Sequence, residues 1–238
     1  MPRELKRKED PIDDAQSRFE MIFVVEMIAR LKAEQKRLAE RVIMEDIPPF
    51  DNKFVTGIDV SYAEYIAVGC VVLMDMESWE IIQTEQRTVE CSVPYIPGYF
   101  FLREGPVLIE LLKDIDKPGP VLIDGNGILH PRRLGLASHV GVHLDLQTIG
   151  VSKKLLLGEK QPRQGNEAGI LDGSECIGRA LWLSGRKRPV YVSVGHRISL
   201  STAVEVVRSS SVSGYPEPLR EAHRISKRTL LKLQQEKS

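Results

Sequence analysis

Residues 124–141, DGNGILHPRRLGLASHVG, combine side chains that could bind a metal ion and phosphate. The segment opens with Asp124 and holds two histidines and two arginines among several glycines. It follows the apolar run 121–123, which is typical of a buried strand. Since each unpaired charge in a core costs on the order of several kcal/mol, a core does not need these residues, whereas a site for metal and phosphate does.

Two aspartates each end an apolar, strand-like run: Asp59 ends FVTGID and Asp124 ends VLID. In an open α/β sheet, ligands bind outside the carboxyl ends of the strands. If the two strands are neighbours, the carboxylates repel each other unless a cation lies between them, and Mg²⁺ prefers such oxygen ligands. Either aspartate alone could equally cap a turn or a helix, so it is the pair that favours a metal site.

Three more polar residues are candidates for the same site. Glu104 lies near the start of a predicted helix, where the helix dipole favours a carboxylate. His196 lies between a predicted strand and a predicted helix, and Lys153 directly follows a strand. Each of the three could also be an ordinary structural or solvated residue, and taken singly none of them decides the function.

The loop VPYIPG, residues 93–98, holds Tyr95 and Ile96 between two prolines that stiffen it. Large apolar side chains are costly to expose, so the simpler interpretation is a loop folded onto the core. The alternative is a rigid wedge that enters a stack of nucleic-acid bases.

The elements that must position these residues form a mixed α/β sheet. Residues 1–12 are predicted to be a polar tail, and residues 13–238 to be a single domain that begins with a long helix over 15–45, packed on the body. Three antiparallel strands come first, and helices then alternate with strands. The predicted strands are 54–60, 66–75, 81–89, 120–124, 148–151 and 189–194, and the further helices are 101–115, 136–144, 199–208 and a basic one over 220–235. Residues 173–183 fit either state.

The composition is that of an ordinary soluble protein, with 42% hydrophobic and 28% charged residues. The 33 basic and 33 acidic residues cancel, so any contact with nucleic acid must come from local basic patches. The odd count of three cysteines argues against a disulfide framework, and they lack metal-ligand spacing. No secretory signal and no apolar run of roughly 20 residues is present, so we expect a cytoplasmic protein without membrane contact. A monomer is the simplest expectation.

Five segments in this order resemble the endonuclease V family. They are GIDVSY (57–62), VPYIPG with LRE (93–98 and 102–104), DGNGILHPRRLGLASHVGV (124–142), TIGVSKK (148–154) and GHRISLSTA (195–203). The resemblance covers about residues 50–205 and implies a ribonuclease H-like fold. It also implies an enzyme that cuts DNA or RNA next to deaminated bases, above all hypoxanthine.

The resemblance implies a role for each candidate residue. Asp59 and Asp124 would be the metal-binding carboxylates on adjacent strands, and Glu104 would complete the acidic cluster. His196 would assist near the metal or its water, and Lys153 would lie by the scissile phosphate.

The resemblance also implies how the base is recognised. The wedge would be Pro94, Tyr95, Ile96 and Pro97, and the hypoxanthine pocket would be lined by Gly98, Gly125, Gly135 and Leu136. Missing side chains at the glycines would let the backbone read the base edge. Arg103 and His130 match family positions of less certain role, and His139 matches a position that we interpret as structural.

The departures from the family pattern are modest. Many relatives have Phe where Leu102 stands, Gln where Asn126 stands and Ala where Ser152 stands. None of these changes removes a metal ligand, so activity is still expected. The pair Phe100 and Phe101, beside the wedge, would adjust the shape of the pocket.

The expected reaction is Mg²⁺-dependent hydrolysis, with Mn²⁺ able to substitute, of a strand that contains deoxyinosine. The cut would fall at the second phosphodiester bond on the 3′ side of the lesion and leave a 3′-hydroxyl and a 5′-phosphate. One alternative is an endoribonuclease specific for inosine in RNA. Another is a module that binds the lesion without cutting, but the complete set of acidic residues argues against it.

Overall fold

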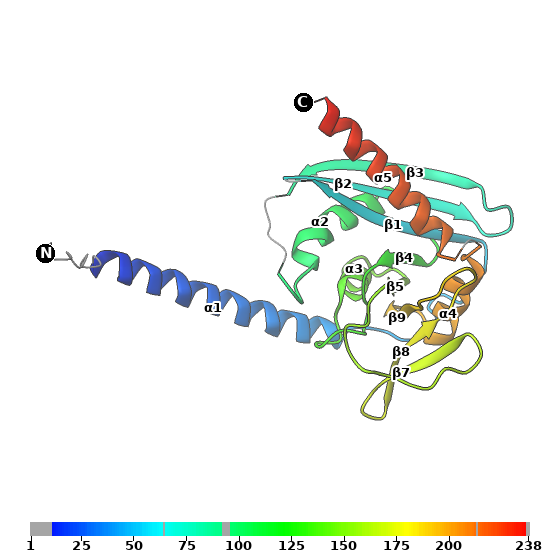
Figure 1. The fold of residues 1–238 in the computed structure, drawn as a ribbon, viewed down its shortest axis with the longest axis horizontal. Helices are drawn as coiled ribbons and strands as arrows, with labels where there is room; N and C mark the ends of the chain where they lie inside the picture. The colour runs from blue at the N-terminus through cyan, green and yellow to red at the C-terminus, as the bar shows by residue number, and fades with distance from the viewer. Residues whose placement is uncertain (1–10, 64, 92–95, 213, 237–238) are drawn as a thin grey trace, which may run out of the picture.

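A nine-stranded sheet organises the chain, with the strand order β3-β2-β1-β4-β5-β9-β8-β7-β6 (Figure 1). It is seen in a computed structural model that describes residues 11–63, 65–91, 96–212 and 214–236, with side chains from residue 25 onward. The strands are β1 (Phe54–Ala63), β2 (Ile66–Asp75), β3 (Ile81–Glu90), β4 (Val121–Asp124), β5 (Thr148–Ser152), β6 (Glu159–Lys160), β7 (Glu167–Asp172), β8 (Glu175–Leu181) and β9 (Val190–His196).

The mixed sheet predicted from the sequence is confirmed. β1, β2 and β3 form an antiparallel meander, and β4 and β5 run parallel to β1. β9 then returns antiparallel to β5, and β8, β7 and β6 continue this antiparallel part to the far edge. Residues 173–183, which fitted either state, belong to the β7–β8 hairpin.

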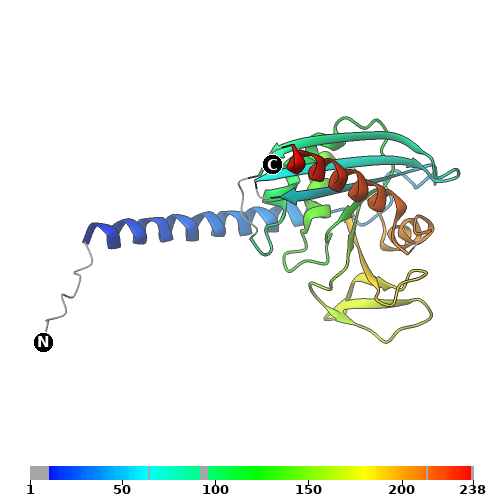
Figure 2. The ribbon, with the colours of Figure 1, turned by 45° about the horizontal axis from the view of Figure 1, so that its top comes forward.

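Helices cover both faces of the sheet and create two apolar cores. The helices are α1 (Pro11–Ala39), α2 (Phe101–Leu112), α3 (Leu136–Leu144), α4 (Leu200–Ser209) and α5 (Glu217–Gln235). On one face, Leu108 of α2 and Val140 of α3 pack with Ile58 of β1. On the other face, Val206 of α4 and Leu219 of α5 pack in a second core, together with the apolar strand residues that point to that face. The result is a helix–sheet–helix sandwich (Figure 2).

α5 lies unusually close to β1. A Cβ atom on Gly57 of β1 would lie 2.2 Å from the carbonyl carbon of Pro218, a distance at which no side chain fits. The absence of a side chain at this position therefore lets the start of α5 rest directly on the middle of the sheet. From there α5 runs in the same direction as β1, since Ser226, two turns later, hydrogen-bonds Ser61 further along the strand (Oγ–Oγ 2.8 Å).

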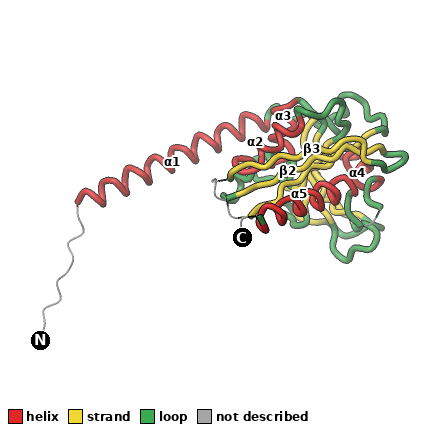
Figure 3. The backbone as a smooth tube through the Cα atoms, turned by 90° about the horizontal axis from the view of Figure 1, so that it is seen from above, coloured by secondary structure: helices red, strands yellow, loops and turns green. Residues whose placement is uncertain are grey.

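The long N-terminal helix differs from the prediction. It ends at Ala39, not at residue 45, and most of it projects away from the body instead of packing on it (Figures 1 and 3). Val25 is 61% exposed and Met27 is 38% exposed. The physical reason is that apolar and charged side chains alternate around the helix, so it has no continuous apolar face to bury. Only its last turns reach the body, where Gln35 is buried.

Among the described residues, no helix combines the length and the apolar character needed to cross a membrane.

Candidate active site

The two strand-end aspartates stand side by side. β1 and β4 are parallel neighbours in which Ile58 pairs with Ile123, so Asp59 and Asp124, one residue further on each strand, lie level with each other. Both side chains point to the α5 face, because the alternating pattern places Ile58 and Ile123 in the core of the opposite face. Their side chains are 11% and 29% exposed, so both carboxylates are accessible yet largely surrounded by protein.

Lys153 and Glu104 meet this pair from two other elements. The Lys153 Nζ lies 2.5 Å from Asp124 Oδ2, because Lys153 follows β5, the next strand of the sheet. Glu104 lies in the first turn of α2 and is buried. Burial raises the pKa of Glu104 to about 8, and the negative charges of Asp59 and Asp124 add to the rise. The structure thus brings together four residues singled out in the sequence.

A histidine that the sequence motifs do not include completes the cluster. His223 of α5 lies with Nδ1 2.9 Å from Asp59 Oδ2, and the Oγ of Ser226 lies 3.4 Å from the same oxygen. Burial raises the pKa of Asp59 above its usual value, the hydrogen bond from His223 opposes this rise, and Asp124 adds to it.

Tyr215 lies next to Asp124. Its ring is buried, and the Lys153 Nζ lies 4.9 Å from the ring centroid. Burial raises the pKa of its hydroxyl, and the charges of Asp124 and Asp59 raise it further. Like His223, it comes from the C-terminal part of the chain.

The chemistry of this donor set fits a divalent cation. Asp59, Asp124 and Glu104 are hard oxygen donors whose mutual repulsion is offset only in part by Lys153 and His223. A cation between them would remove the repulsion. Within the described part of the chain, however, no three or more acidic, histidine or cysteine side chains form a group that could already hold a metal ion.

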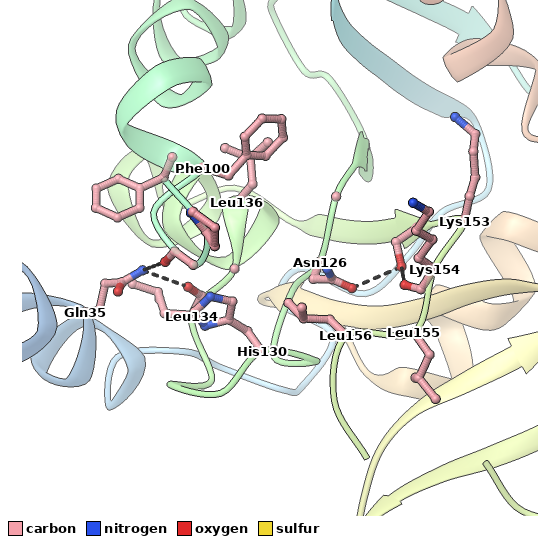
Figure 4. A pocket seen from close by; sticks show the side chains of 16 residues that line it. Gln35, Phe100, Asn126, His130, Leu134, Leu136, Lys153, Lys154, Leu155 and Leu156 are labelled. Carbon is pink, nitrogen blue, oxygen red and sulfur yellow. Dashed lines mark hydrogen bonds between the residues drawn. The ribbon is translucent and has the colours of Figure 1, made fainter. Parts of the chain in front are cut away.

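A cavity of about 490 Å³ opens next to these acids, a size within the usual range of small-molecule sites. All four residues expected to recognise the base line it: Gly98, Gly125, Gly135 and Leu136. Figure 4 shows its other walls, which come from α1, from the 130–134 turn and from residues 153–156 after β5. Lys153 belongs to both the cavity wall and the acidic cluster, so the two are contiguous.

At Gly135, close packing of the backbone leaves no room for a side chain. A Cβ atom there would lie 2.2 Å from the carbonyl oxygen of Asn126, so this glycine allows the start of α3 to pack against residues 125–127. At Gly125 a Cβ atom would lie 3.4 Å from the Cβ of Leu136, on the cavity wall. A Cβ atom at Gly125 would thus lie at ordinary contact distance and take up only a little of the cavity, whereas the glycine at 135 is required by the backbone that forms it.

The endonuclease V family profile matches residues 36–224, which is most of the chain. The chain belongs to the endonuclease V family. It is accordingly an endonuclease that hydrolyses phosphodiester bonds, and its sheet is that of the ribonuclease H-like fold.

Relatives and solved structures of this family match nearly the full length of the chain. Endonuclease V of Thermococcus kodakarensis is 40% identical over 202 residues, covering 84% of this chain and 91% of the relative. That of Dictyoglomus thermophilum is 38% identical over 202 residues, covering 82% and 88%. The crystal structure of the catalytic domain of human endonuclease V is 32% identical and superimposes with a TM-score of 0.80 over 87% of this chain and 97% of the human one.

A Ciona intestinalis endonuclease V is similar in structure and was crystallised with nucleic acid. It is 30% identical, with a TM-score of 0.79 over 87% of this chain and 99% of the Ciona one. Its complex contains a 24mer DNA with an inosine followed by a ribo-adenosine.

His196, which matches an endonuclease V motif, lies away from the acidic cluster. Because β9 is antiparallel to β5, His196 pairs with Thr148 at the start of β5, the opposite end from that facing Asp124. Its Nδ1 accepts a hydrogen bond from the backbone N–H of Ile43 (3.2 Å), and its Nε2 lies 3.3 Å from Asp145 Oδ1. The expected role near the metal does not fit this place, and His196 instead anchors the segment that follows α1.

The expected wedge falls partly outside the described residues. Pro94 and Tyr95 are not described, so their role stays a prediction. Ile96 is half-buried, and Pro97 is exposed and lines the cavity.

Arg103, His130 and His139, also singled out in the sequence, have distinct surroundings. The Arg103 guanidinium lies 4.2 Å over the ring of Tyr62, beside Glu104. His130 is buried on the cavity wall, and burial lowers its pKa to about 4. His139 stacks on Phe101 with ring centroids 4.1 Å apart, in agreement with a structural role.

The positions that depart from the family pattern are accommodated locally. Ser152 Oγ donates to Asn126 Oδ1 (3.0 Å), so two of the departures form one hydrogen bond on the cavity wall (Figure 4). Phe100 and Phe101 both line the cavity, as expected of residues that shape it.

Proposed function

We propose that this protein cuts DNA strands that contain deoxyinosine, at the second phosphodiester bond on the 3′ side of the lesion, with Mg²⁺ as cofactor and Mn²⁺ as a substitute. The observation that carries the proposal is the contact between the acidic cluster and the cavity, shared through Lys153. A base held in the cavity has its own backbone next to Asp124. The complex of the Ciona relative with inosine-containing DNA supports the same substrate class.

Asp59 and Asp124 are the residues that would hold the metal, with Glu104 completing the set. A bound divalent cation supplies Lewis-acid activation of water and stabilises charge on the phosphate and the leaving oxygen. Glu104, buried and with a raised pKa, is suited to orient that water or to hold a proton.

The chain's own residues handle the phosphate and the protons. Lys153 is 54% exposed at its side chain and can turn from Asp124 to a phosphate oxygen, where it neutralises charge. Water adds to phosphorus and loses a proton, while the bond from phosphorus to O3′ breaks and O3′ gains a proton. His223, 58% exposed and hydrogen-bonded to Asp59, is placed to carry one of these protons.

The cavity would receive the base after it has left the stack. Flipping costs a few kcal/mol and costs least for a weakly paired base such as hypoxanthine. Gly98 and Gly125 line the cavity without side chains, so a base edge could approach the backbone there, and Leu136 would offer an apolar surface to its ring. Tyr95 would fill the gap that the base leaves in the stack.

The decisive experiment uses a single-stranded oligonucleotide with one deoxyinosine and its deoxyguanosine counterpart. With Mg²⁺ we expect a single cut in the first substrate, none in the second, and none after chelation of the metal. Asp124→Ala should lower the rate by at least about 10³-fold, since it removes a metal ligand. Cleavage by this variant at the wild-type rate would overturn the assignment.

A matched strand with inosine in RNA tests the alternative substrate. The DNA in the Ciona complex carries a ribo-adenosine after the inosine, so that relative binds a strand with a ribonucleotide at this position. Faster cleavage of the RNA strand would make this protein an endoribonuclease, and binding of either strand without cutting would make it a lesion-binding module.

A further inference from the structure

The exposed face of α5 carries positive charge that the proposed mechanism does not use. No acidic residue occurs between Ala222 and Gln235. Within the part of the chain that the structure describes, Arg224 pairs with Glu221, but no carboxylate forms an ion pair with Lys227, Arg228 or Lys232. In a protein whose net charge is zero, three exposed and unpaired cations on one helix face form a distinct basic patch.

The orientation of this face is fixed by the opposite side of the helix. Ala222, Ser226 and Leu230 are buried against the sheet, and Ser226 is tied to Ser61 of β1. The basic side chains must therefore face the solvent. Together they form a shallow hollow of about 510 Å³ lined by His223, Arg224, Lys227, Arg228, Leu231, Lys232 and Gln235, which we call the α5 basic face.

The α5 basic face begins at the active site. His223, its first residue, is hydrogen-bonded to Asp59. At a rise of 1.5 Å per residue, Lys227 lies about 6 Å and Lys232 about 14 Å further along the helix. At a spacing of 3.4 Å per stacked nucleotide, the face is long enough for about four nucleotides.

The cavity and the α5 basic face lie on opposite sides of the acidic cluster. Most of the cavity wall is formed by residues at or after the ends of β4 and β5, with Gln35 and residues from 97–101 completing it, whereas α5 packs on β1 and β2. In the sheet order β2-β1-β4-β5, the aspartates of β1 and β4 lie between them. α5 then continues to the end of the sheet at which β3 ends (Figures 1 and 2).

We infer that the α5 basic face binds the phosphate backbone of the cleaved strand on the 3′ side of the cut. This inference rests on the proposed function, because a cut on the 3′ side of a base held in the cavity gives the strand its direction. From the cavity the strand crosses Asp124 and Asp59 and continues onto α5. The exposed Leu231 adds an apolar contact for a sugar or a base between the cations.

The first test measures how salt weakens binding. We compare the full chain with the variant Lys227→Gln, Arg228→Gln and Lys232→Gln on a single-stranded deoxyinosine oligonucleotide in the presence of chelator. Three lost phosphate contacts reduce the slope of log K against log salt by about 2, so between 50 and 200 mM salt the variant should lose about 20-fold less affinity than the wild type. Glutamine has a similar helix propensity to lysine and arginine, so the fold should be retained.

A matched control removes three positive charges elsewhere. The control variant carries Arg41→Gln, Lys53→Gln and Lys117→Gln; Lys53 and Lys117 line a separate cavity at the opposite end of the sheet. We expect its salt slope to equal that of the wild type. Equal slopes for all three proteins, or equal reductions in both variants, would overturn the inference.

The second test asks on which side of the lesion the contacts lie. One oligonucleotide ends two nucleotides after the deoxyinosine, which keeps the proposed scissile bond but removes the strand beyond it. Another is shortened to the same length on the 5′ side. The triple variant of Lys227, Arg228 and Lys232 should bind the 3′-shortened oligonucleotide as tightly as the wild type does. It should bind the 5′-shortened oligonucleotide more weakly than the wild type does.

The outcomes separate this inference from the proposed function. A difference that persists without the 3′ flank, or that disappears without the 5′ flank, contradicts the inference even if Mg²⁺-dependent cleavage is observed. If the wild type binds but does not cut when Mg²⁺ is added, the proposed function fails. The salt slopes and flank dependence still decide whether α5 binds the strand.

Discussion

The buried Glu104 carboxyl should make the metal-free folded protein less stable at neutral pH. Its pKa is raised to about 8, first by burial and then by the charges of Asp59 and Asp124. Between the ordinary value of 4.5 and about 8, the folded state binds more protons than the unfolded state. The metal-free protein should therefore lose stability as the pH rises through this range.

Replacing Glu104 by Gln should stabilise the metal-free protein and abolish its activity. The substitution keeps the shape of the side chain and removes the buried charge, so at pH 7.5 the free energy of unfolding should rise on the order of 2–4 kcal/mol. Denaturant unfolding in chelator at pH 5 and pH 7.5 measures this gain, which should be largest at the higher pH. A variant less stable than the wild type at pH 7.5 would contradict this account.

The acidic residues of the site could be predicted from the sequence, but the histidine could not. Asp59 and Asp124 can be recognised in the sequence because each ends an apolar strand, which is a local pattern. His223 lies in a helix whose neighbouring residues look merely basic, and it meets Asp59 across a separation of 164 residues. His196 shows the converse error, since its polar, glycine-flanked motif sits at the opposite end of β5 from Asp124.

Among the described side chains of α1, the one that hydrogen-bonds the body is Gln35. The Gln35 Nε2 donates to the carbonyl oxygens of Gly98 (3.2 Å) and Leu134 (3.4 Å), and its Oε1 accepts from Arg132 Nε (2.5 Å). Arg132 also donates to the Gly98 carbonyl (2.6 Å). This network fixes the backbone at the cavity wall (Figure 4).

Gln35→Ala should weaken the recognition of the base more than the chemical step. The change leaves the buried carbonyl of Leu134 and the partly buried Nε of Arg132 without this partner, at a cost of about 1–3 kcal/mol in stability. Because the Gly98 carbonyl loses one of its hydrogen-bond donors, we expect KM for a deoxyinosine strand to rise several-fold with kcat nearly constant. Steady-state cleavage by this variant and by the exposed neighbour Lys36→Ala, which should match the wild type, measures the effect; a lower kcat at unchanged KM would refute it.

Most strands could be predicted because their apolar runs are long and bounded by turns. β2 and α3 have the predicted bounds, and β1 and β3 extend the predictions by a few residues. The projection of α1 was missed, although the sequence carries a signal for it: the apolar residues are spread around the helix axis and leave no continuous apolar face. Residues 173–183 were ambiguous because a short apolar run fits a strand and a helix equally well.

For the whole molecule, the projecting part of α1 should be dispensable. The described side chains from residue 25 to 30 are mostly exposed, and most of α1 projects away from the body (Figure 3). Removing residues 1–24 should therefore shift the unfolding temperature by no more than about 2 °C, the effect of a typical surface change in a chain of this size. Thermal unfolding and cleavage of the shortened chain test this, and a loss of several degrees would show that the segment does pack on the body.

The pairing of His223 with Asp59 also ties activity to the completeness of folding. The contact joins residues 164 positions apart and requires β1 to be paired in the sheet and α5 to be docked on Gly57. Contacts between such distant segments form late, because a long loop must be closed before they are gained. A partly folded chain in which α5 has not docked therefore lacks the assembled site, so cleavage should appear during refolding only together with the docking of α5.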